Sequence, residues 1–380
     1  VLLPVALGLL WQSCTNALRG IPVHWILYGH LRLLANLHDE GVVVDTCMRL
    51  GGVASMLADS SMMFEGNRGQ CLLAYLGAFQ LGIRALQTHP ESKHVQRACS
   101  NFMGNTMLFN RPNGLYAAKL GAMELMLRAA SHWPDDPGMS FWGNMGCFLD
   151  ACPENRIRFM QLGGMEAMLA AMKRHYWVPE AVVQPWYGYS AICYDPVTAM
   201  RCKELGIMEI GLQSMKDHPG SPRVREEVLQ AFKAMTVNHR EYRIELVEMG
   251  ALAEYEKAIT ENISDPQLVS LVCENTATLV GGAAIHSVQG AHHLEWNETT
   301  QRKAVEAGLL SATLEAVKEE GRMVWRPMAS GYEVARDCVQ VLSILAYKSP
   351  ENQDALVKLG AVDEAMNVLY RSWAREDIKY

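Results

Sequence analysis

The sequence PENRIRFMQLGGMEAMLAAM, residues 153–172, carries the local pattern that decides the fold. After Gly163 its apolar side chains follow one another at helical spacing, at Met165, Leu169 and Met172. This spacing places them on one face of a helix. Glycine accepts a left-handed backbone conformation with little strain, so a short helix can end at Gly163 and a second can begin directly after it. The stretch therefore predicts two short helices joined by a sharp turn.

The phrase around Gly163, an apolar residue followed by glycine and two mostly apolar residues, recurs along the chain. Its glycines are Gly51, Gly121, Gly163, Gly206, Gly250, Gly308 and Gly360. The three middle steps are 42, 43 and 44 residues, and the last two are longer by insertions. The first step, of 70 residues, has room for two short repeats, with Gly82 as the candidate for the missing glycine. A period of this length is typical of helical repeat proteins, so each glycine is expected to be a structural anchor at a helix end.

A third amphipathic helix is expected in every repeat. Val224–Val237 shows it best, because Val224, Val228 and Phe232 share one face. Turn sequences such as His218-Pro219-Gly220 separate second from third helices, and Pro-Glu-Asn sequences at 153–155 and 350–352 begin first helices. No strand-like alternation is sustained, so the fold class is all-α.

These features resemble the armadillo repeat family, through the glycine anchors, the Pro-Glu-Asn sequences and the three-helix period near 42. The resemblance covers about residues 22–375. It implies a right-handed superhelix of about seven to nine armadillo-type repeats, which binds partners and is not an enzyme. We expect residues 1–21 to form an apolar N-terminal cap and residues 22–380 to form the solenoid. Insertions in the solenoid are expected near 176–189, 281–300 and 321–332.

Composition narrows the function. The chain has 380 residues, of which 49% are hydrophobic and 20% charged, and its net charge is −7. These values rule out disorder as the main state, and the absence of a basic run argues against nucleic-acid binding. No apolar stretch reaches the roughly 20 residues of a transmembrane helix. The ten scattered cysteines contain no CxxC pair and are expected to be reduced and free of disulfides. We therefore expect an intracellular reducing compartment, with the cytoplasm preferred and a mitochondrion or plastid as the alternative.

Two groups of residues are candidates for partner binding. In armadillo proteins that grip extended peptides, a third-helix Asn lies sixteen positions before the anchor glycine, with a Trp about four earlier. Only Asn105 matches the Asn position and only Trp186 the Trp position, while Ser190 replaces Asn in its repeat. Recognition of basic peptides in the manner of nuclear import is therefore not expected.

The second group lies in two aromatic-proline stretches, because Trp, Tyr and Arg dominate binding hot spots. Its members are Trp177, Trp186, Tyr187 and Tyr189, between residues 176 and 189, and Trp325 and Arg326 in the last insertion. We expect loops that meet a partner. The alternative is that the aromatic residues fold back onto neighbouring helices.

Catalytic and metal chemistry have weaker signals. The insertion 281–300 contains three imidazoles and two carboxylates, at His286, His292, His293, Glu295 and Glu298. Such groups can bind zinc, but no HExxH, Walker or GxSxG pattern is present, so no metal or cofactor is expected. The leading function is a non-enzymatic protein-interaction scaffold, in its more specific form an accessory subunit of a large, organellar assembly. The alternatives are an adaptor that binds peptide cargo in the concave groove, and a metal-binding or enzymatic site in the insertion.

Overall fold

The structure, a computed structural model, describes six ranges of the chain. They are residues 23–58, 67–139, 142–150, 152–281, 297–322 and 331–376. The chain divides into two compact units, residues 1–198 and 199–380, which we call unit 1 and unit 2. All regular elements in the described ranges are helices, so the predicted all-α fold class is confirmed.

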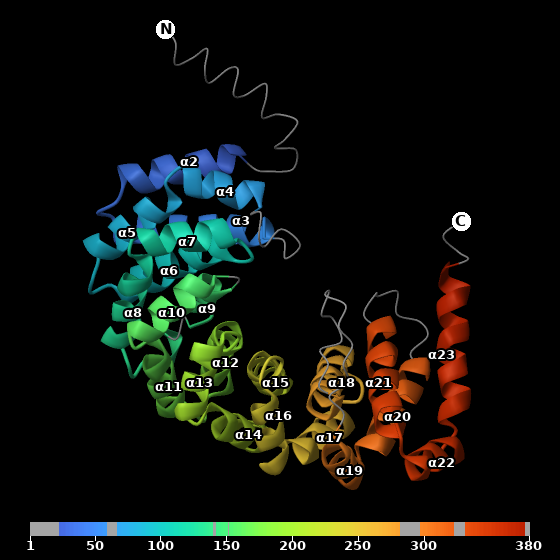
Figure 1. Cartoon of the computed structure of the whole chain (residues 1–380). Coiled ribbons are helices and arrows are strands. Elements are labelled where there is room, and N and C mark those ends of the chain that lie inside the picture. The colour runs from blue at the N-terminus through green and yellow to red at the C-terminus, as the bar shows by residue number, and fades with distance from the viewer. Residues whose placement is uncertain are drawn as a thin grey trace. The chain divides into compact units, whose positions relative to one another are not determined.

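Unit 1 contains helices α2 to α12 (Figure 1). Their bounds are α2 (Val23–Ala35), α3 (Glu40–Met56), α4 (Arg68–Tyr75), α5 (Ala78–Thr88), α6 (Lys93–Met107), α7 (Arg111–Lys119), α8 (Ala122–His132), the 3₁₀ turn η2 (Pro137–Met139), α9 (Trp142–Leu149), α10 (Pro153–Gln161), α11 (Gly164–Arg174) and α12 (Pro179–Ile192). Helix α13 (Pro196–Glu204) crosses the division between the units.

Unit 2 continues the series. Its helices are α14 (Ile207–Asp217), α15 (Pro222–Thr236), α16 (Arg240–Glu248), α17 (Ala251–Glu261), α18 (Pro266–Gly281), α19 (Glu298–Glu306), α20 (Leu309–Arg322), α21 (Gly331–Ala346), α22 (Pro350–Lys358) and α23 (Ala361–Glu376).

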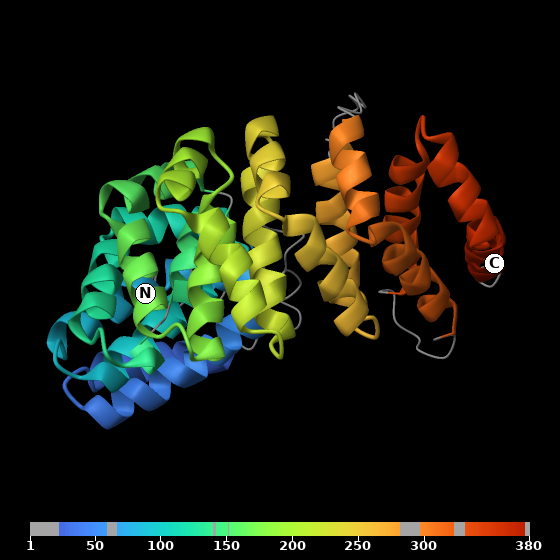
Figure 2. The same cartoon turned by 90° about the horizontal axis from the view of Figure 1, so that it is seen from below.

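The helices form three-helix repeats. Six complete repeats run from α4 to α21, preceded by the pair α2–α3 and followed by the pair α22–α23. In unit 2 the third helices α15, α18 and α21 stand side by side, as Figures 1 and 2 both show. In unit 1 the second helices α5, α8 and α11 follow one another along the left edge of Figure 1. Within each unit, successive repeats thus bury their apolar faces against each other, which is the architecture of an armadillo-type α-solenoid.

The anchor glycines account for the turn between first and second helices. Six of the seven, all except Gly51, have φ between 73° and 91°. At Gly163, for example, α10 ends and α11 begins. The backbone N–H of Gly163 donates to the carbonyl of Met160, which closes the end of the first helix.

Gly51 does not lie at a helix end, as the repeated phrase predicts. It lies inside α3 without positive φ, and a Cβ added there would lie 3.3 Å from Cα of Phe102 on α6. Its role is therefore to let two third helices approach closely. The missing anchor is also not Gly82, which lies within α5, but Gly77, whose φ is 96°.

The Pro-Glu-Asn sequences cap the preceding third helix. Asn155 is buried, and its side-chain amide donates to the carbonyls of Phe148 at 2.8 Å and Gly114 at 3.2 Å. Asn352 repeats the first of these bonds, to the carbonyl of Leu345 at 2.8 Å. Each asparagine thus satisfies carbonyls that a helix end leaves without partners.

Histidines at the ends of second helices connect consecutive repeats. Nε2 of His89, which follows α5, donates to the carbonyl of Leu37 at 2.9 Å. Nε2 of His175, which follows α11, donates to the carbonyl of Pro134 at 2.8 Å. Both bonds reach back into the preceding repeat and join its loop to the next second helix.

Two cysteines differ from the prediction that the chain has no disulfides. Free thiols are found at Cys47, Cys71, Cys99, Cys147, Cys152, Cys273 and Cys338. Cys193 and Cys202 are disulfide-bonded, so the expectation of no disulfides is wrong there. The local sequence does not distinguish these two cysteines from the free ones, because disulfide formation depends on how the chain folds after α12. Elsewhere thiols face each other between successive third helices, as at Cys47 and Cys99, whose Sγ atoms are 2.9 Å apart.

The predicted insertions have different outcomes. Residues 176–189 form no inserted loop, because α11 ends at Arg174 and α12 begins at Pro179. Most of 281–300 and of 321–332 lies outside the described residues, as does the expected cap 1–21. None of the helices in the described ranges is long and apolar enough to span a bilayer.

The same substitution at two glycines should change stability in opposite directions. Gly163→Ala should lower the free energy of unfolding by about 1 kcal/mol, because its φ of 73° strains any residue with a Cβ. Gly52→Ala lies on an exposed part of α3 with nothing within 4 Å of the new Cβ, and should raise it by about 0.5–1 kcal/mol. Urea unfolding monitored by circular dichroism measures both. Equal losses at the two positions would contradict the assignment of the turn.

Thiol mapping should reveal the disulfide-bonded cysteines. After unfolding without reductant, alkylation should label Cys71, Cys147 and Cys152 but leave Cys193 and Cys202 unmodified. A reduced sample serves as the control, in which all five are labelled. Peptide mass spectrometry that finds Cys193 alkylated before reduction would show that the bond does not form.

Candidate functional site

The first aromatic-proline stretch is helical core and not a binding loop. Pro179 occupies the first turn of α12, where a missing N–H costs nothing, and Pro185 lies inside the same helix. Trp186 and Tyr189 are fully buried. The Tyr189 hydroxyl donates to the carbonyl of Met165 at 2.8 Å, and burial raises the pKa of this phenol. The prediction of exposed anchors at these two positions is wrong, because packing of α12 against its neighbours outweighs the turn-forming tendency of proline.

Tyr187 and Ser190 also form hydrogen bonds within the fold. The Tyr187 hydroxyl donates to Oδ2 of Asp150 at 3.2 Å. Burial raises the pKa of Asp150, and the hydrogen bond from Tyr187 opposes that rise. The Ser190 hydroxyl donates to the carbonyl of Tyr187 at 2.8 Å. Both side chains are half-buried, and their polar atoms are used within unit 1.

Asn105, the one match to the peptide-gripping asparagines, forms hydrogen bonds with neighbouring helices. Its side-chain Nδ2 donates to the carbonyl of Gly51 at 3.1 Å, and its backbone carbonyl accepts from Nε2 of Gln70 at 2.8 Å. With Trp186 buried as well, the two residues that suggested a peptide groove hold repeats together.

Trp177 is the one aromatic residue of this stretch whose side chain is largely in solvent. It is 74% exposed and meets the ring of Tyr176 edge-on, with centroids 5.1 Å apart. Trp325 and Arg326 lie outside the described residues, as do the histidines of the insertion 281–300. Within the described ranges, no three His, Cys, Asp or Glu side chains are grouped so that they could hold a metal ion.

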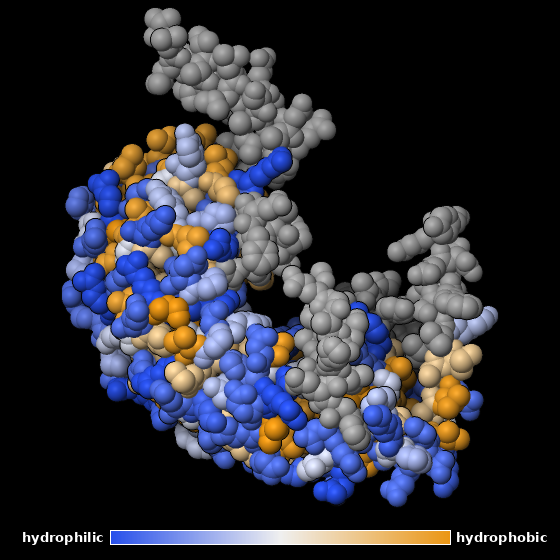
Figure 3. Space-filling model, viewed as in Figure 1, coloured by the Kyte–Doolittle hydropathy of each residue, from blue (hydrophilic) through white to orange (hydrophobic). Residues whose placement is uncertain are grey.

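Helix α2 presents an apolar stripe that sequence inspection missed. Its inner side buries Ile26 and Leu33 completely. Its outer side exposes further large apolar side chains, which are Trp25 (56%), Leu27 (38%), Tyr28 (58%), Leu31 (66%) and Leu34 (52%). Figure 3 shows apolar surface over this helix at the top of the view. The signal was available in Val23–Ala35, whose apolar residues cover more than one helical face.

Helix α23 carries a similar stripe in unit 2. Val362, Met366 and Tyr370 follow one another every fourth residue, and their exposures are 57%, 61% and 76%. Val357 on α22 is 62% exposed. An amphipathic helix of a closed domain turns such a face to the core, so both α2 and α23 offer surface for contacts.

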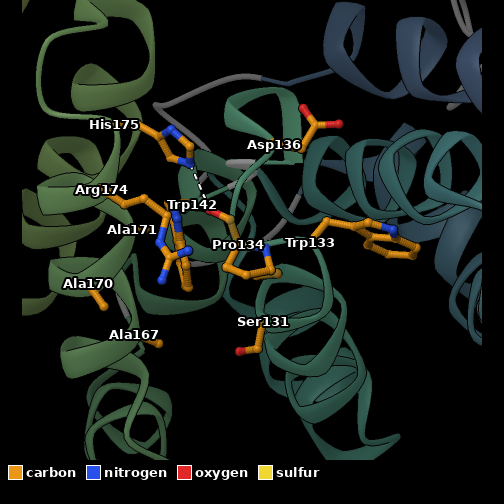
Figure 4. A pocket seen from close by; sticks show the side chains of 11 residues that line it. Ser131, Trp133, Pro134, Asp136, Trp142, Ala167, Ala170, Ala171, Arg174 and His175 are labelled. Atoms are coloured by element: carbon orange, nitrogen blue, oxygen red, sulfur yellow. Dashed lines mark hydrogen bonds between the residues drawn. The ribbon is translucent and has the colours of Figure 1, made fainter.

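A pocket lies between the second helices α8 and α11, and we call it the α8–α11 pocket (Figure 4). Its volume is about 190 Å³. It is lined by Ala130, Ser131, Trp133, Pro134, Asp136, Trp142, Ala167, Ala170, Ala171, Arg174 and His175. The bond from His175 to Pro134 joins its two walls. Arg174 forms an ion pair with Asp135 at its edge.

Comparisons with known proteins find a similarity of fold. No family model and no curated protein matches the sequence. An engineered protein solved by the Northeast Structural Genomics Consortium is similar in structure, with a TM-score of 0.62 and 13% identity, over 90% of this chain and 72% of that one. Two designed armadillo repeat proteins match less well. They are YIII(Dq)4CqI (TM-score 0.43, 15% identity, 84% of this chain and 98% of that one) and YIII(Dq.V1)4CPAF in complex with peptide (KR)4 (0.40, 16%, 83% and 98%).

The likeness to the Consortium's engineered protein, at 13% identity, shows the fold alone.

Replacing Trp177 and replacing Trp186 should lower the free energy of unfolding by clearly different amounts. Trp186→Ala should cost about 3–5 kcal/mol, because it empties a fully buried site on α12. Trp177→Ala should cost less than about 0.5 kcal/mol, because most of that side chain is in solvent. Urea unfolding of the two single variants measures the difference. Comparable losses would mean that the exposed tryptophan is also part of the core.

Proposed function

We propose that this armadillo-type α-solenoid is a non-enzymatic scaffold whose partners are other proteins. The observation that carries the proposal is the exposed apolar stripe on α2. Contiguous apolar surface on a soluble protein marks an interaction site. A helix that is apolar on both sides belongs in an environment covered on both sides, and the described residues of unit 1 bury only the inner side of α2.

The chemistry of the stripe favours a protein partner. It combines the aromatic side chains of Trp25 and Tyr28, whose rings meet edge-on at 6.5 Å, with the aliphatic Leu31 and Leu34. Aromatic anchors surrounded by aliphatic contacts are typical of binding hot spots. The net charge of −7 argues for proteins over nucleic acids.

The contacts of the described candidate residues support a non-catalytic role. The side chains of Asn105 and Tyr187 donate hydrogen bonds to residues outside their own helices, and Ser190 donates to a carbonyl of its own helix α12. Trp186, the other residue that suggested a peptide groove, is core. The scaffold is therefore favoured over the peptide adaptor, and its more specific form is an accessory subunit held in a larger assembly through its terminal helices.

The proposal includes the compartment, which is an intracellular reducing one. Seven free thiols support an intracellular reducing environment, whereas the disulfide-bonded Cys193 and Cys202 point the other way. The thiol mapping described above, applied to protein isolated from its native source, decides between them.

Partner capture with matched variants tests the scaffold. Tagged protein is used to capture proteins from its native source, which mass spectrometry identifies. Leu31→Glu places a charge in the α2 stripe and should reduce retention of the main partner about tenfold or more. Met200→Glu makes the same kind of change at a 51% exposed apolar side chain on α13 and should retain it.

Both variants should melt within a few degrees of the wild type, because both positions are in solvent. A partner lost equally from both variants, or from neither, would refute the assignment of α2 as the contact surface. Failure to capture any stoichiometric partner would refute the scaffold function itself.

A further inference from the structure

Two pairs of cysteines lie at borders between consecutive third helices. In unit 1, Cys47 on α3 faces Cys99 on α6, and their Sγ atoms are 2.9 Å apart. In unit 2, Cys273 on α18 faces Cys338 on α21, and their Sγ atoms are 2.6 Å apart. All four side chains are completely buried. Each unit thus holds one pair of sulfur atoms in direct contact at a border of repeats.

Other buried cysteines do not share this arrangement. Sγ of Cys147 donates to the carbonyl of Gly143 on its own helix at 3.5 Å. Sγ of Cys152 donates to the carbonyl of Arg111 at 3.7 Å. Both of these bonds join sulfur to a backbone oxygen. Contact with a second sulfur atom therefore separates the two pairs from cysteines that only fill the core.

The first pair lies where α3 and α6 approach each other closely. Gly51 follows Cys47 by about one turn of α3, and Phe102 follows Cys99 by about one turn of α6. A Cβ added to Gly51 would lie 3.3 Å from Cα of Phe102. A disulfide forms without backbone movement only where the two Cα atoms are within roughly 7 Å. The close approach of these two helices is the condition that such a bond needs.

A polar contact holds the second pair in register. The hydroxyl of Ser270, about one turn before Cys273 on α18, donates to the carboxylate of Asp337, the neighbour of Cys338 on α21. Asp337 is completely buried and also forms an ion pair with Arg336. A buried carboxylate with satisfied partners resists sliding of one helix along the other. The two helices stand side by side in Figures 1 and 2.

The pair in unit 1 is protected while its helices are closed. The hydrogen bond with Cys47, together with burial, raises the pKa of Cys99 well above its usual value. The thiolate is the reactive form of cysteine, so this thiol reacts slowly in the closed structure. Transient separation of α3 from α6 exposes it to small oxidants, and closure brings the two sulfur atoms together again.

We propose that Cys47 with Cys99, and Cys273 with Cys338, are redox-modification sites at which a peroxide joins consecutive third helices through a disulfide. The thiolate of one cysteine attacks an oxygen of hydrogen peroxide, the O–O bond breaks, and a sulfenic acid and hydroxide form. The hydroxide takes up the proton that the first thiol released.

The second cysteine of each pair completes the reaction. Its thiol sulfur attacks the sulfenic sulfur, the S–O bond breaks and water leaves with the thiol proton. Two thiols and one peroxide thus give one disulfide and two waters, with sulfur oxidised and the peroxide oxygens reduced. The sulfur atoms of either pair have to approach by less than about 1 Å to reach bonding distance.

The cross-links act on the solenoid itself, so the inference goes beyond the scaffold function and does not depend on it. The paired cysteines are 52 residues apart in unit 1 and 65 in unit 2. A disulfide between residues so far apart in sequence restricts the unfolded chain strongly. Oxidation therefore stabilises one border of repeats in each unit, and thiol reductants reverse it.

Peptide mapping tests the chemistry on the folded, full-length protein. Reduced protein is treated with hydrogen peroxide, quenched with catalase, unfolded in an alkylating reagent and digested without reductant. Mass spectrometry should find both proposed cross-links. Cys71 is less buried, but its Sγ accepts a hydrogen bond from the amide of Asn110, and it should enter no disulfide. Alkylation of all four paired cysteines, links to any other cysteine, or sulfinic acids in place of the cross-links would overturn the inference.

Melting temperatures test the effect of the cross-links. Peroxide should raise the melting temperature of the wild type by about 5 °C more than that of the double variant Cys99→Ala/Cys338→Ala. The bond between Cys193 and Cys202 can form in both proteins and cancels in this difference. Each protein is compared with its own reduced form, so any loss of packing in the variant also cancels.

Cys71→Ala is the matched control and should show the same rise as the wild type. Equal rises in the wild type and the double variant would overturn the inference, as would cross-links that leave the melting temperature unchanged. No partner enters these measurements, so their failure would leave the scaffold function to the capture experiment on Leu31.

Discussion

The left-handed glycine between first and second helices is the constraint on which the whole stack depends. At Gly77, Gly121 and Gly206 the backbone turns with φ of 96°, 81° and 73°. The residue that follows each of them is completely buried. Because the turn is so tight, the second helix enters the core at its first residue, and the third helix can then pack across both. A residue with a Cβ would strain this turn in every repeat.

Hydrogen bonds at the helix ends complete what the glycines begin. Asn155 closes the third helix that precedes it, and His175 ties its own repeat to the loop of the repeat before. Both are polar side chains that bond backbone carbonyls at the borders of repeats, a buried one for Asn155 and an exposed one for His175.

The repeat fold could be predicted because its signal is local and recurs. The phrase at Gly163 specifies its own turn, and the period carries it to five more positions. Gly51 shows the limit of this reasoning. Its neighbours in sequence look the same, but the reason for glycine there is Phe102, fifty residues away on α6. A local pattern cannot distinguish a glycine that turns from a glycine that lets two helices touch.

The candidate site was harder to predict for the same reason. Trp186 and Trp177 are both flanked by prolines in sequence, yet one is core and the other is in solvent, because only the packing of α12 decides which side faces inward. The α8–α11 pocket is lined by residues of two successive repeats, from Ala130 to His175. It depends on how α8 and α11 pack, which a local sequence pattern does not specify.

The bonds at the borders of repeats also have a mechanical meaning. In unit 1, the bonds of His89 and His175, and the bond from Asn155 to Gly114, each reach to an adjacent repeat. Because each repeat contacts only its neighbours, a pulling force along such a unit would load the borders one at a time. The array would then lengthen in steps of one repeat and would shorten again as the repeats re-form.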